Sequence, residues 1–189
     1  DLELLTKTGG KSGVWINPDA LVPEWVLERL PSTTLLAERK IAIVVISDRA
    51  SEGTYDDESG QYLIESLKAQ GAEICEYKVI PDDFDLIQTT ISEISKTYDP
   101  HVILCTGGTG PGPRDVTPLA LADHLNPELP GLGEWLRSES AVYTKTAWLS
   151  RMGGGLIGRA LVITLPGSLQ AVKECFGIFI EGLPKEPIK

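Results

Sequence analysis

A glycine-rich segment between residues 106 and 115 carries groups that could bind phosphate. It reads Thr-Gly-Gly-Thr-Gly-Pro-Gly-Pro-Arg-Asp and follows an apolar run that ends at residue 106. Glycines leave backbone N–H groups open to phosphate oxygens, while threonine adds hydroxyl donors and arginine adds a cation. The segment lacks the Gly-Lys-Ser/Thr ending of a Walker motif, and no Gly-x-Gly-x-x-Gly follows the first apolar run. We therefore predict an anion-binding loop rather than a generic glycine turn, formed by Thr106, Gly107, Gly108, Thr109, Gly110 and Arg114.

Two aspartates follow neighbouring apolar runs and suggest a metal. Asp82 comes after the run at residues 72–80, and Asp115 closes the glycine segment. In a parallel sheet the carboxyl ends of the strands share one edge, so both side chains should reach the same site. A carboxylate beside a phosphate is repulsive unless a hard cation bridges them, which suggests Mg²⁺ held by Asp82 and Asp115. The alternative is that each aspartate caps a helix.

Polar turns after the other strands contribute further candidates. Each turn has an ordinary explanation, because turns between strands and helices are commonly built from Gly, Pro, Asp and Ser, and it is their joint occurrence that suggests one site. Residues 130–134 either open a helix or deliver a carboxylate to the site. The three glycines at 153–155 suggest a mobile loop that carries the preceding arginine toward an anion, or else a bare surface loop. These candidates are Ser47, Asp48, Asp57, Thr117, Gly131, Glu134, Ser150, Arg151, Pro166, Gly167 and Ser168.

An alternation of strands and helices from residue 41 positions these loops. Residues 41–46 form a continuous β-branched and apolar run, as expected of a strand buried on both faces. Strands that alternate with helices predict an α/β fold of three layers, a mostly parallel sheet with helices on both faces. The predicted strands are 41–46, 72–80, 102–106 and 160–165. Helices are predicted from about 59 to 70, 87 to 98, from a cap at 117, 133 to 146 and 168 to 180.

The remaining chemistry of the chain favours phosphoryl or nucleotidyl transfer. Neither histidine fits a Ser-His-Asp order, and no lysine lies in an apolar strand as a Schiff-base candidate. The loops supply hydrogen-bond donors, positioning and a metal site. In phosphoryl transfer the substrate supplies the nucleophile, while the protein orients the reactants and neutralises charge.

Composition limits the class of protein. The 189 residues are 42% hydrophobic and 23% charged, with a formal net charge of −10. An acidic chain argues against non-specific nucleic-acid binding, and no apolar run approaches the length of a membrane helix. The cysteines are Cys75, Cys105 and Cys175, an odd number in apolar settings, which is typical of free thiols in a reducing compartment. We expect a cytoplasmic protein.

Six segments in this order resemble molybdenum cofactor biosynthesis proteins, specifically molybdopterin adenylyltransferases of the MogA type. The segments are 47–53, 80–82, 106–118, 130–134, 149–151 and 165–168. The resemblance implies the MogA-like fold, a homotrimer, and Mg-dependent transfer of AMP from ATP to molybdopterin with release of pyrophosphate. It places catalysis and Mg²⁺ on Asp82 and Asp115 and the substrate contacts on the other loops. A related subgroup with other roles reads Gly-Asp-Glu-Leu in the first loop, whereas this chain reads Ser-Asp-Arg, which favours adenylyl transfer.

The first residues resemble a second family of the same pathway. Residues 4–13 are similar to the C-terminal tail of cyclic pyranopterin monophosphate synthases of the MoaC type, in which the lysine that matches Lys7 lies at the active site. The acid and lysine residues that accompany this tail are absent, so we expect no synthase activity. We interpret residues 1–40 as the tail of a fused synthase domain plus a linker, and residues 41–189 as the MogA-like domain.

Two other classes of function remain open from the sequence. A non-catalytic molybdopterin carrier would have the same loops without nucleotide chemistry. A scaffold domain on the same fold would bind no small ligand and would expose an apolar face. Incubation with ATP, Mg²⁺ and molybdopterin separates the three, since only the enzyme releases pyrophosphate.

Overall fold

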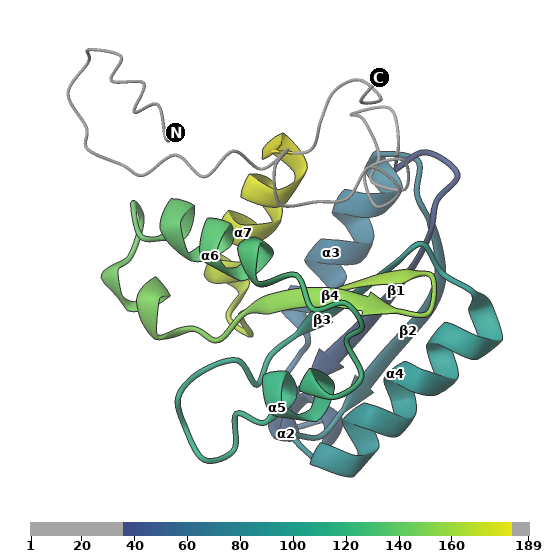
Figure 1. Cartoon of the computed structure of the whole chain (residues 1–189), viewed down its shortest axis with the longest axis horizontal. Helices are drawn as coiled ribbons and strands as arrows, with labels where there is room; N and C mark the ends of the chain where they lie inside the picture. Colours follow the sequence, from purple (N-terminus) through teal and green to yellow (C-terminus); the bar gives the residue numbers. More distant parts are fainter. Residues whose placement is uncertain (1–35, 183–189) are drawn as a thin grey trace, which may run out of the picture.

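A five-stranded sheet organises residues 36–182, which are the part of the chain described by the structure, a computed structural model. The strands lie in the order β2-β1-β3-β5-β4, and β4 is the strand that runs antiparallel to its neighbour (Figure 1). The mostly parallel sheet confirms the predicted α/β fold. The strands are β1 (Lys40–Ile46), β2 (Glu73–Ile80), β3 (Val102–Thr106), β4 (Gly153–Ile157) and β5 (Ala160–Leu165).

Helices cover both faces of the sheet and complete the three layers. Helices α3, α6 and α7 pack on one face, whereas α4 and α5 pack on the other (Figure 1). The helices are α2 (Asp48–Ser51), α3 (Glu58–Ala69), α4 (Phe84–Tyr98), α5 (Thr117–Ala122), α6 (Pro130–Ser140), the 3-10 helix η2 (Lys145–Leu149) and α7 (Leu169–Gly182).

Strand β1 shows why its sequence is apolar throughout. Ile41, Ile43 and Val45 belong to the core under α3, α6 and α7. The alternate residues from Ala42 to Ile46 belong to the second core under α4 and α5. Because successive side chains of a strand point to opposite faces, a strand covered on both sides must be apolar at every position.

The strand order creates a crevice beside the end of β1. The chain leaves β1 toward β2 on one side of the sheet, and later strands are added on the other side, beginning with β3. In open α/β sheets the loops after the strands diverge at such a reversal and leave a ligand-binding crevice. The loops after β1, β3 and β5 all open at this edge, as predicted from their polar composition.

The glycine stretch predicted as a mobile loop forms β4 instead. Gly153, Gly154 and Gly155 pair antiparallel with Thr164, Ile163 and Val162. A Cβ atom on Gly154 would lie 2.3 Å from the carbonyl oxygen of Val162, and one on Gly155 would lie 2.7 Å from that of Pro127. Close backbone packing therefore requires glycine at these positions. Because glycine has a low strand propensity, the sequence does not indicate a strand here.

Three predicted helix boundaries were wrong. The helix expected at 133–146 begins earlier, at Pro130, and ends at Ser140, after which η2 forms a separate turn. The residue that caps α5 is Val116, and Thr117 is the first residue of the helix, with no side-chain cap. Pro118 at the start of α5 and Pro130 at the start of α6 both match the preference of proline for the first turn.

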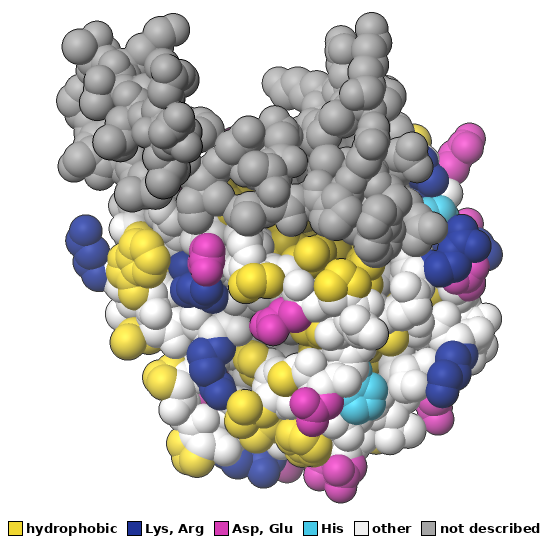
Figure 2. Space-filling model, in the orientation of Figure 1, with side chains coloured by type: hydrophobic (Ala, Val, Ile, Leu, Met, Phe, Trp, Pro, Cys, Tyr) yellow, Lys and Arg dark blue, Asp and Glu magenta, His cyan; other side chains and the backbone are white. Residues whose placement is uncertain are grey.

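Charged side chains of both signs lie on the surface of the described chain (Figure 2). Figure 2 shows acidic and basic side chains interspersed over the visible face rather than gathered into one basic stripe. In residues 36–182, no helix combines the length and apolar character needed to cross a membrane.

Most of the predicted synthase tail and linker at residues 1–40 lies outside the described residues. At its end Leu36 packs into the core and Lys40 begins β1.

Replacing Ile91 by alanine is expected to lower the free energy of unfolding by about 2–5 kcal/mol, because it leaves a cavity in the core under α4. Ile91 is fully buried, whereas Leu86 on the same helix is 40% exposed. Leu86→Ala should therefore cost less than about 1 kcal/mol. Urea denaturation of both variants measures the difference, and equal losses would contradict the proposed packing of α4.

Candidate functional site

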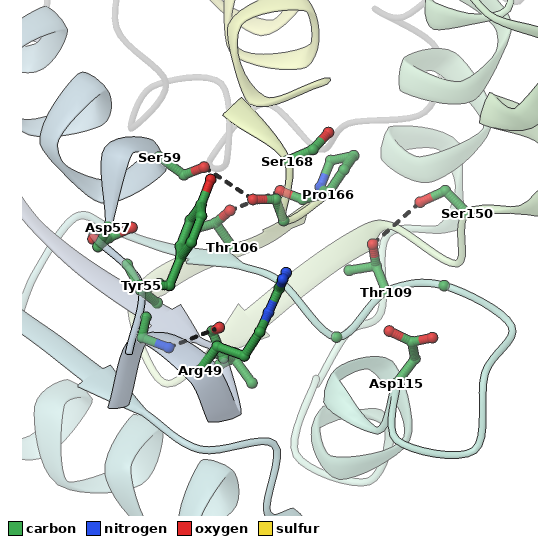
Figure 3. A pocket seen from close by; sticks show the side chains of 18 of the residues that line it. Arg49, Tyr55, Asp57, Ser59, Thr106, Thr109, Asp115, Ser150, Pro166 and Ser168 are labelled. Atoms are coloured by element: carbon green, nitrogen blue, oxygen red, sulfur yellow. Dashed lines mark hydrogen bonds between the residues drawn. The ribbon is translucent and has the colours of Figure 1, made fainter. Parts of the chain in front are cut away.

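A hollow of ≈ 540 Å³ lies at the carboxyl ends of β1, β3 and β5 (Figure 3). Loops far apart in the sequence form its wall, as expected at the reversal in strand order. Predicted residues that line it are Ser47, Asp57, Thr106, Gly107, Gly108, Thr109, Gly110, Asp115, Ser150, Pro166, Gly167 and Ser168. Predicted residues outside its lining are Asp48, Asp82, Arg114, Thr117, Gly131, Glu134 and Arg151.

The glycine loop enters the hollow through a close backbone contact. Gly107 has φ +107°, and a Cβ atom there would lie 2.0 Å from the carbonyl oxygen of Ile46 at the end of β1. Gly108 also has a positive φ, of +62°. A side chain at either position would be strained, so the loop presents bare backbone to the hollow. This is the geometry expected of an anion-binding loop.

Hydroxyl groups hold the loops around the hollow together. Thr106 Oγ1 donates to the carbonyl oxygen of Pro166 at 2.7 Å, and Ser59 Oγ donates to that of Gly167 at 2.9 Å (Figure 3). Ser150 Oγ lies 3.3 Å from Thr109 Oγ1. These hydrogen bonds join the loop after β5 to β3 and α3, and the segment before β4 to the glycine loop.

Hydrogen bonds between Asp82 and Asp48 connect the loop after β2 to the loop after β1. Asp48 N donates to Asp82 Oδ2, and Asp82 N donates to Asp48 Oδ1, both at 3.0 Å. Burial raises the pKa of Asp82, and the nearby negative charges of Asp48 and Asp115 add to that rise. A bound cation would offset the nearby negative charges and lower the pKa of Asp82 again.

Arg114 pairs with Asp48 rather than lining the hollow. Its Nη2 atom lies 2.6 Å from Asp48 Oδ2 and 2.7 Å from Oδ1. This hydrogen-bonded guanidinium lowers the pKa of Asp48. The predicted phosphate-binding cation thus connects the glycine loop to the loop after β1.

Asp82 and Asp115 both border the glycine loop. The Asp82 Oδ1 atom lies 2.9 Å from the position of a Cβ on Gly108, and Asp115 Oδ2 lies 2.7 Å from that on Gly110. Asp115 Oδ2 also accepts from Gly112 N at 2.9 Å. Among the described residues, no group of three or more His, Cys, Asp or Glu side chains could hold a metal. Two carboxylates beside a loop of exposed backbone nevertheless fit Mg²⁺, because this ion commonly takes one or two carboxylates and completes its shell with substrate phosphates and water.

Arg151 is held against the glycine loop rather than in a mobile loop. Its Nε and Nη2 atoms donate to the carbonyl oxygen of Gly110 at 3.0 and 2.8 Å, and Nη2 also donates to that of Asp115. Its backbone N–H donates to Thr109 O at 2.7 Å. Arg151 therefore fixes the shape of the loop that carries Asp115.

Several candidates have structural partners or lie apart from the hollow. Asp57 caps α3 through Gly60 N, and its Oδ2 accepts from Tyr77 Oη at 2.5 Å. Burial, with Asp57 as hydrogen-bond partner, raises the pKa of Tyr77 to about 12. Gly131 and Glu134 lie in the first turns of α6, and Glu134 is exposed.

Thr117 has an unusual environment beside Asp82. Its side chain is fully buried, and its Oγ1 atom has no hydrogen-bond partner within the described chain. That atom lies 2.3 Å from the position of a Cβ on Gly108, next to Asp82 Oδ1. The hydroxyl therefore faces the glycine loop across the same narrow gap as the carboxylate.

Five polar lining residues were missing from the predicted site: Arg49, Tyr55, Glu58, Ser59 and Thr146. Arg49 and Tyr55 belong to the loop after β1, and the Arg49 guanidinium carbon lies 5.2 Å from the centroid of the Tyr55 ring. The available signal was an arginine and an aromatic residue within the same polar turn. Ser59 gave none, since it reads as an ordinary first-turn helix residue.

Replacing Asp82 by asparagine is expected to raise the melting temperature at neutral pH by a few degrees, because the amide has no charge to desolvate. Since the pKa of Asp82 is raised, the wild type loses stability relative to the variant as pH rises through that pKa. The advantage should disappear below the ordinary aspartate pKa of 3.8. Thermal unfolding at acidic and neutral pH measures it.

The matched control is Asp83→Asn, on the neighbouring residue. Asp83 is exposed and caps α4 through Leu86 N, a role that asparagine fills equally well. This variant should show no gain in melting temperature that grows with pH. A neutral-pH melting temperature for Asp82→Asn at or below that of the wild type would contradict the raised pKa.

Comparisons with known proteins identify the family. The family described as "Probable molybdopterin binding domain" matches residues 42–185. The chain is 41% identical over 140 residues to a molybdopterin adenylyltransferase of Escherichia coli (strain K12), which covers 71% of this chain and 70% of that protein. It is 39% identical over 181 residues to a molybdenum cofactor biosynthesis bifunctional protein of Synechococcus elongatus, covering 96% of this chain but 54% of the relative. The chain thus spans about half the length of that bifunctional protein.

A solved structure agrees with this assignment. The crystal structure of the molybdopterin biosynthesis enzyme MoaB from Thermus thermophilus is 32% identical, with a TM-score of 0.72. The similarity covers 77% of this chain and 92% of the Thermus chain. This chain belongs to the molybdopterin-binding domain family of molybdenum cofactor biosynthesis proteins, as its loop motifs predicted.

Proposed function

We propose that this chain transfers AMP from ATP to molybdopterin, which yields adenylyl-molybdopterin and pyrophosphate. The observation that carries the proposal is the glycine loop, whose bare backbone lies beside both Asp82 and Asp115 at the reversal in strand order. The identity to the Escherichia coli adenylyltransferase supports the same activity. The two carboxylates and the loop would bring a nucleotide and a phosphorylated acceptor together.

The chain acts mainly by positioning the reactants. The terminal phosphate oxygen of molybdopterin forms a bond to the α-phosphorus of ATP. The bond between that phosphorus and the bridging oxygen breaks, and pyrophosphate leaves with the electron pair. Backbone N–H groups of the glycine loop bind phosphate oxygens and hold the reacting atoms in line. Arg151 keeps the loop in shape through the carbonyl oxygens of Gly110 and Asp115.

Mg²⁺ is the cofactor that we propose for this site, held by Asp82 and Asp115 together with ATP. Bound there, the ion would neutralise charge on the phosphates. The two carboxylates border the loop on which the phosphates would lie. Asp48 keeps Asp82 in place through their reciprocal hydrogen bonds.

We also propose that the chain is the adenylyltransferase part of a longer fusion with a pyranopterin monophosphate synthase, in the cytoplasm. Its match to about half of the bifunctional relative supports this arrangement.

A homotrimer is the assembly that we propose, as the resemblance implies. Large apolar side chains are exposed after the end of α6 and within η2, and Figure 2 shows hydrophobic side chains on this part of the surface. They are Val142 (76% exposed), Tyr143 (66%), Trp148 (58%) and Leu149 (60%). Contiguous exposed apolar residues commonly mark an interface, and a second copy seated on this apolar patch would adjoin the hollow, which Leu149 also lines.

The test of the activity is Mg-dependent release of pyrophosphate from ATP in the presence of molybdopterin. Asp82→Asn and Asp115→Asn should lower turnover by about a hundredfold or more, because each removes a charge that stabilises the transition state. Molybdopterin binding should change much less. The control Asp83→Asn, which preserves the cap of α4, should keep full turnover.

Two outcomes would overturn the proposal. Full turnover by Asp82→Asn would refute the role of that carboxylate. Molybdopterin binding by the wild type without any Mg-dependent pyrophosphate release would instead identify a non-catalytic carrier.

Trp148→Glu is expected to convert the trimer to monomers, because it places a charge in the apolar patch. Light scattering of the purified protein measures the mass. Leu119→Glu is the matched control, since Leu119 is 55% exposed on α5, outside the patch, and this variant should remain a trimer. A monomeric wild type, or a trimeric Trp148→Glu variant, would refute this assembly.

A further inference from the structure

The arginine side chains near the hollow differ in whether they already have hydrogen-bond partners in the protein. Arg114 is committed to Asp48, and Arg151 is committed to the carbonyl oxygens of Gly110 and Asp115. Neither of them lines the hollow. Within residues 36–182, Arg49 is the one lysine or arginine in the lining.

Arg49 is placed by the fold of the loop after β1. It lies in α2, which Ser47 caps through Ala50 N at 3.3 Å. Its carbonyl oxygen accepts from both Thr54 N at 3.0 Å and Thr54 Oγ1 at 2.8 Å. These bonds fold the loop back on itself, so that Tyr55 returns beside Arg49.

The side chain of Arg49 enters the hollow without a carboxylate partner. Figure 3 shows it directed into the space between the strand ends, beside the ring of Tyr55. Its guanidinium carbon lies 5.2 Å from the ring centroid, within the range of a cation–π contact. No ion pair of Arg49 occurs among the described residues. The ring orients the cation and leaves its N–H donors available.

The charges that line the hollow make this cation necessary for an anionic ligand. The acidic lining residues are Asp57, Glu58 and Asp115. A substrate phosphate would meet these negative charges at close range, and backbone N–H groups carry only partial charges. A guanidinium offers a full positive charge and paired donors that match phosphate oxygens.

We propose that Arg49 is the phosphate-binding cation of this site, and that Tyr55 is a positioning residue that holds it. This inference rests on the proposed function, since it assigns a group that would bind one of the proposed substrates. ATP and molybdopterin both carry phosphate, so the ligand chemistry is a phosphate group from either source. Arg114, which the sequence suggested for this role, instead holds the loops together.

The test compares binding by the wild type and Arg49→Ala, measured by calorimetry. One arm uses a non-hydrolysable α,β-methylene analogue of ATP with Mg²⁺, and the other arm uses molybdopterin. Loss of charge-assisted hydrogen bonds should weaken binding in one arm by about tenfold to a hundredfold, and that arm identifies the source of the phosphate. Arg49→Lys should recover part of the affinity, because it keeps the charge. Arg159→Ala, in the exposed turn between β4 and β5 at the opposite edge of the sheet, should bind as the wild type does.

The outcomes separate this inference from the proposed function. Unchanged dissociation constants for Arg49→Ala in both arms, with a wild type that binds and turns over, would overturn the inference alone. A wild type that binds neither ligand would overturn the proposed function and the inference with it.

Tyr55 is tested through the conservative variant. Tyr55→Leu should weaken phosphate binding in the same arm as Arg49→Ala, whereas Tyr55→Phe should bind like the wild type, because the ring and not the hydroxyl holds the guanidinium. Tyr55→Leu in the Arg49→Ala background should add little further loss. Equal affinities for Tyr55→Leu and Tyr55→Phe, or additive losses in the double variant, would overturn the positioning role.

Discussion

The approach of Gly107 to the end of β1 is the constraint on which the rest of the site depends. A Cβ atom there would lie 2.0 Å from the carbonyl oxygen of Ile46, and on the other side a Cβ atom of Gly167 would lie 3.2 Å from Gly107 Cα. Three strand ends can therefore meet only where side chains are absent. This contact aligns the loops after β1, β3 and β5 around one hollow and exposes backbone donors to it.

The charged residues around that contact fall into two groups, which differ in whether they bind the loops or lie at the site. Asp48, Arg114 and Arg151 bind other parts of the loops and give them a defined shape. Asp82, Asp115 and Arg49 border or enter the site, and the half-buried Asp82 has a raised pKa. Charges that the fold holds in an unfavourable environment are commonly found where a ligand later compensates them, so that stability and function compete at such positions.

Much of the fold was predictable because continuous apolar runs indicate strands buried on both faces and apolar residues at helical spacing indicate amphipathic helices. The run at residues 41–46 indicated a strand buried on both faces, and polar residues after each strand located the ligand-binding edge. The prediction failed at β4, because Gly153 to Gly155 have no strand propensity and pair with β5 for reasons of close packing. It also failed at the boundary of α6, where nothing local to Ser140 announces the end of the helix.

The sequence by itself determined the family, the layered fold and the set of loops that form the site, because these depend on local composition and on the order of motifs. It could not decide which charged side chain faces the hollow. Arg49 and Arg114 are equally plausible as residue types, and the choice depends on the partners that the packed loops bring to each. Asp48 pairs with Arg114, while the Arg49 guanidinium lies over the ring of Tyr55. Such contacts join residues distant in the chain, and only the tertiary structure brings them together.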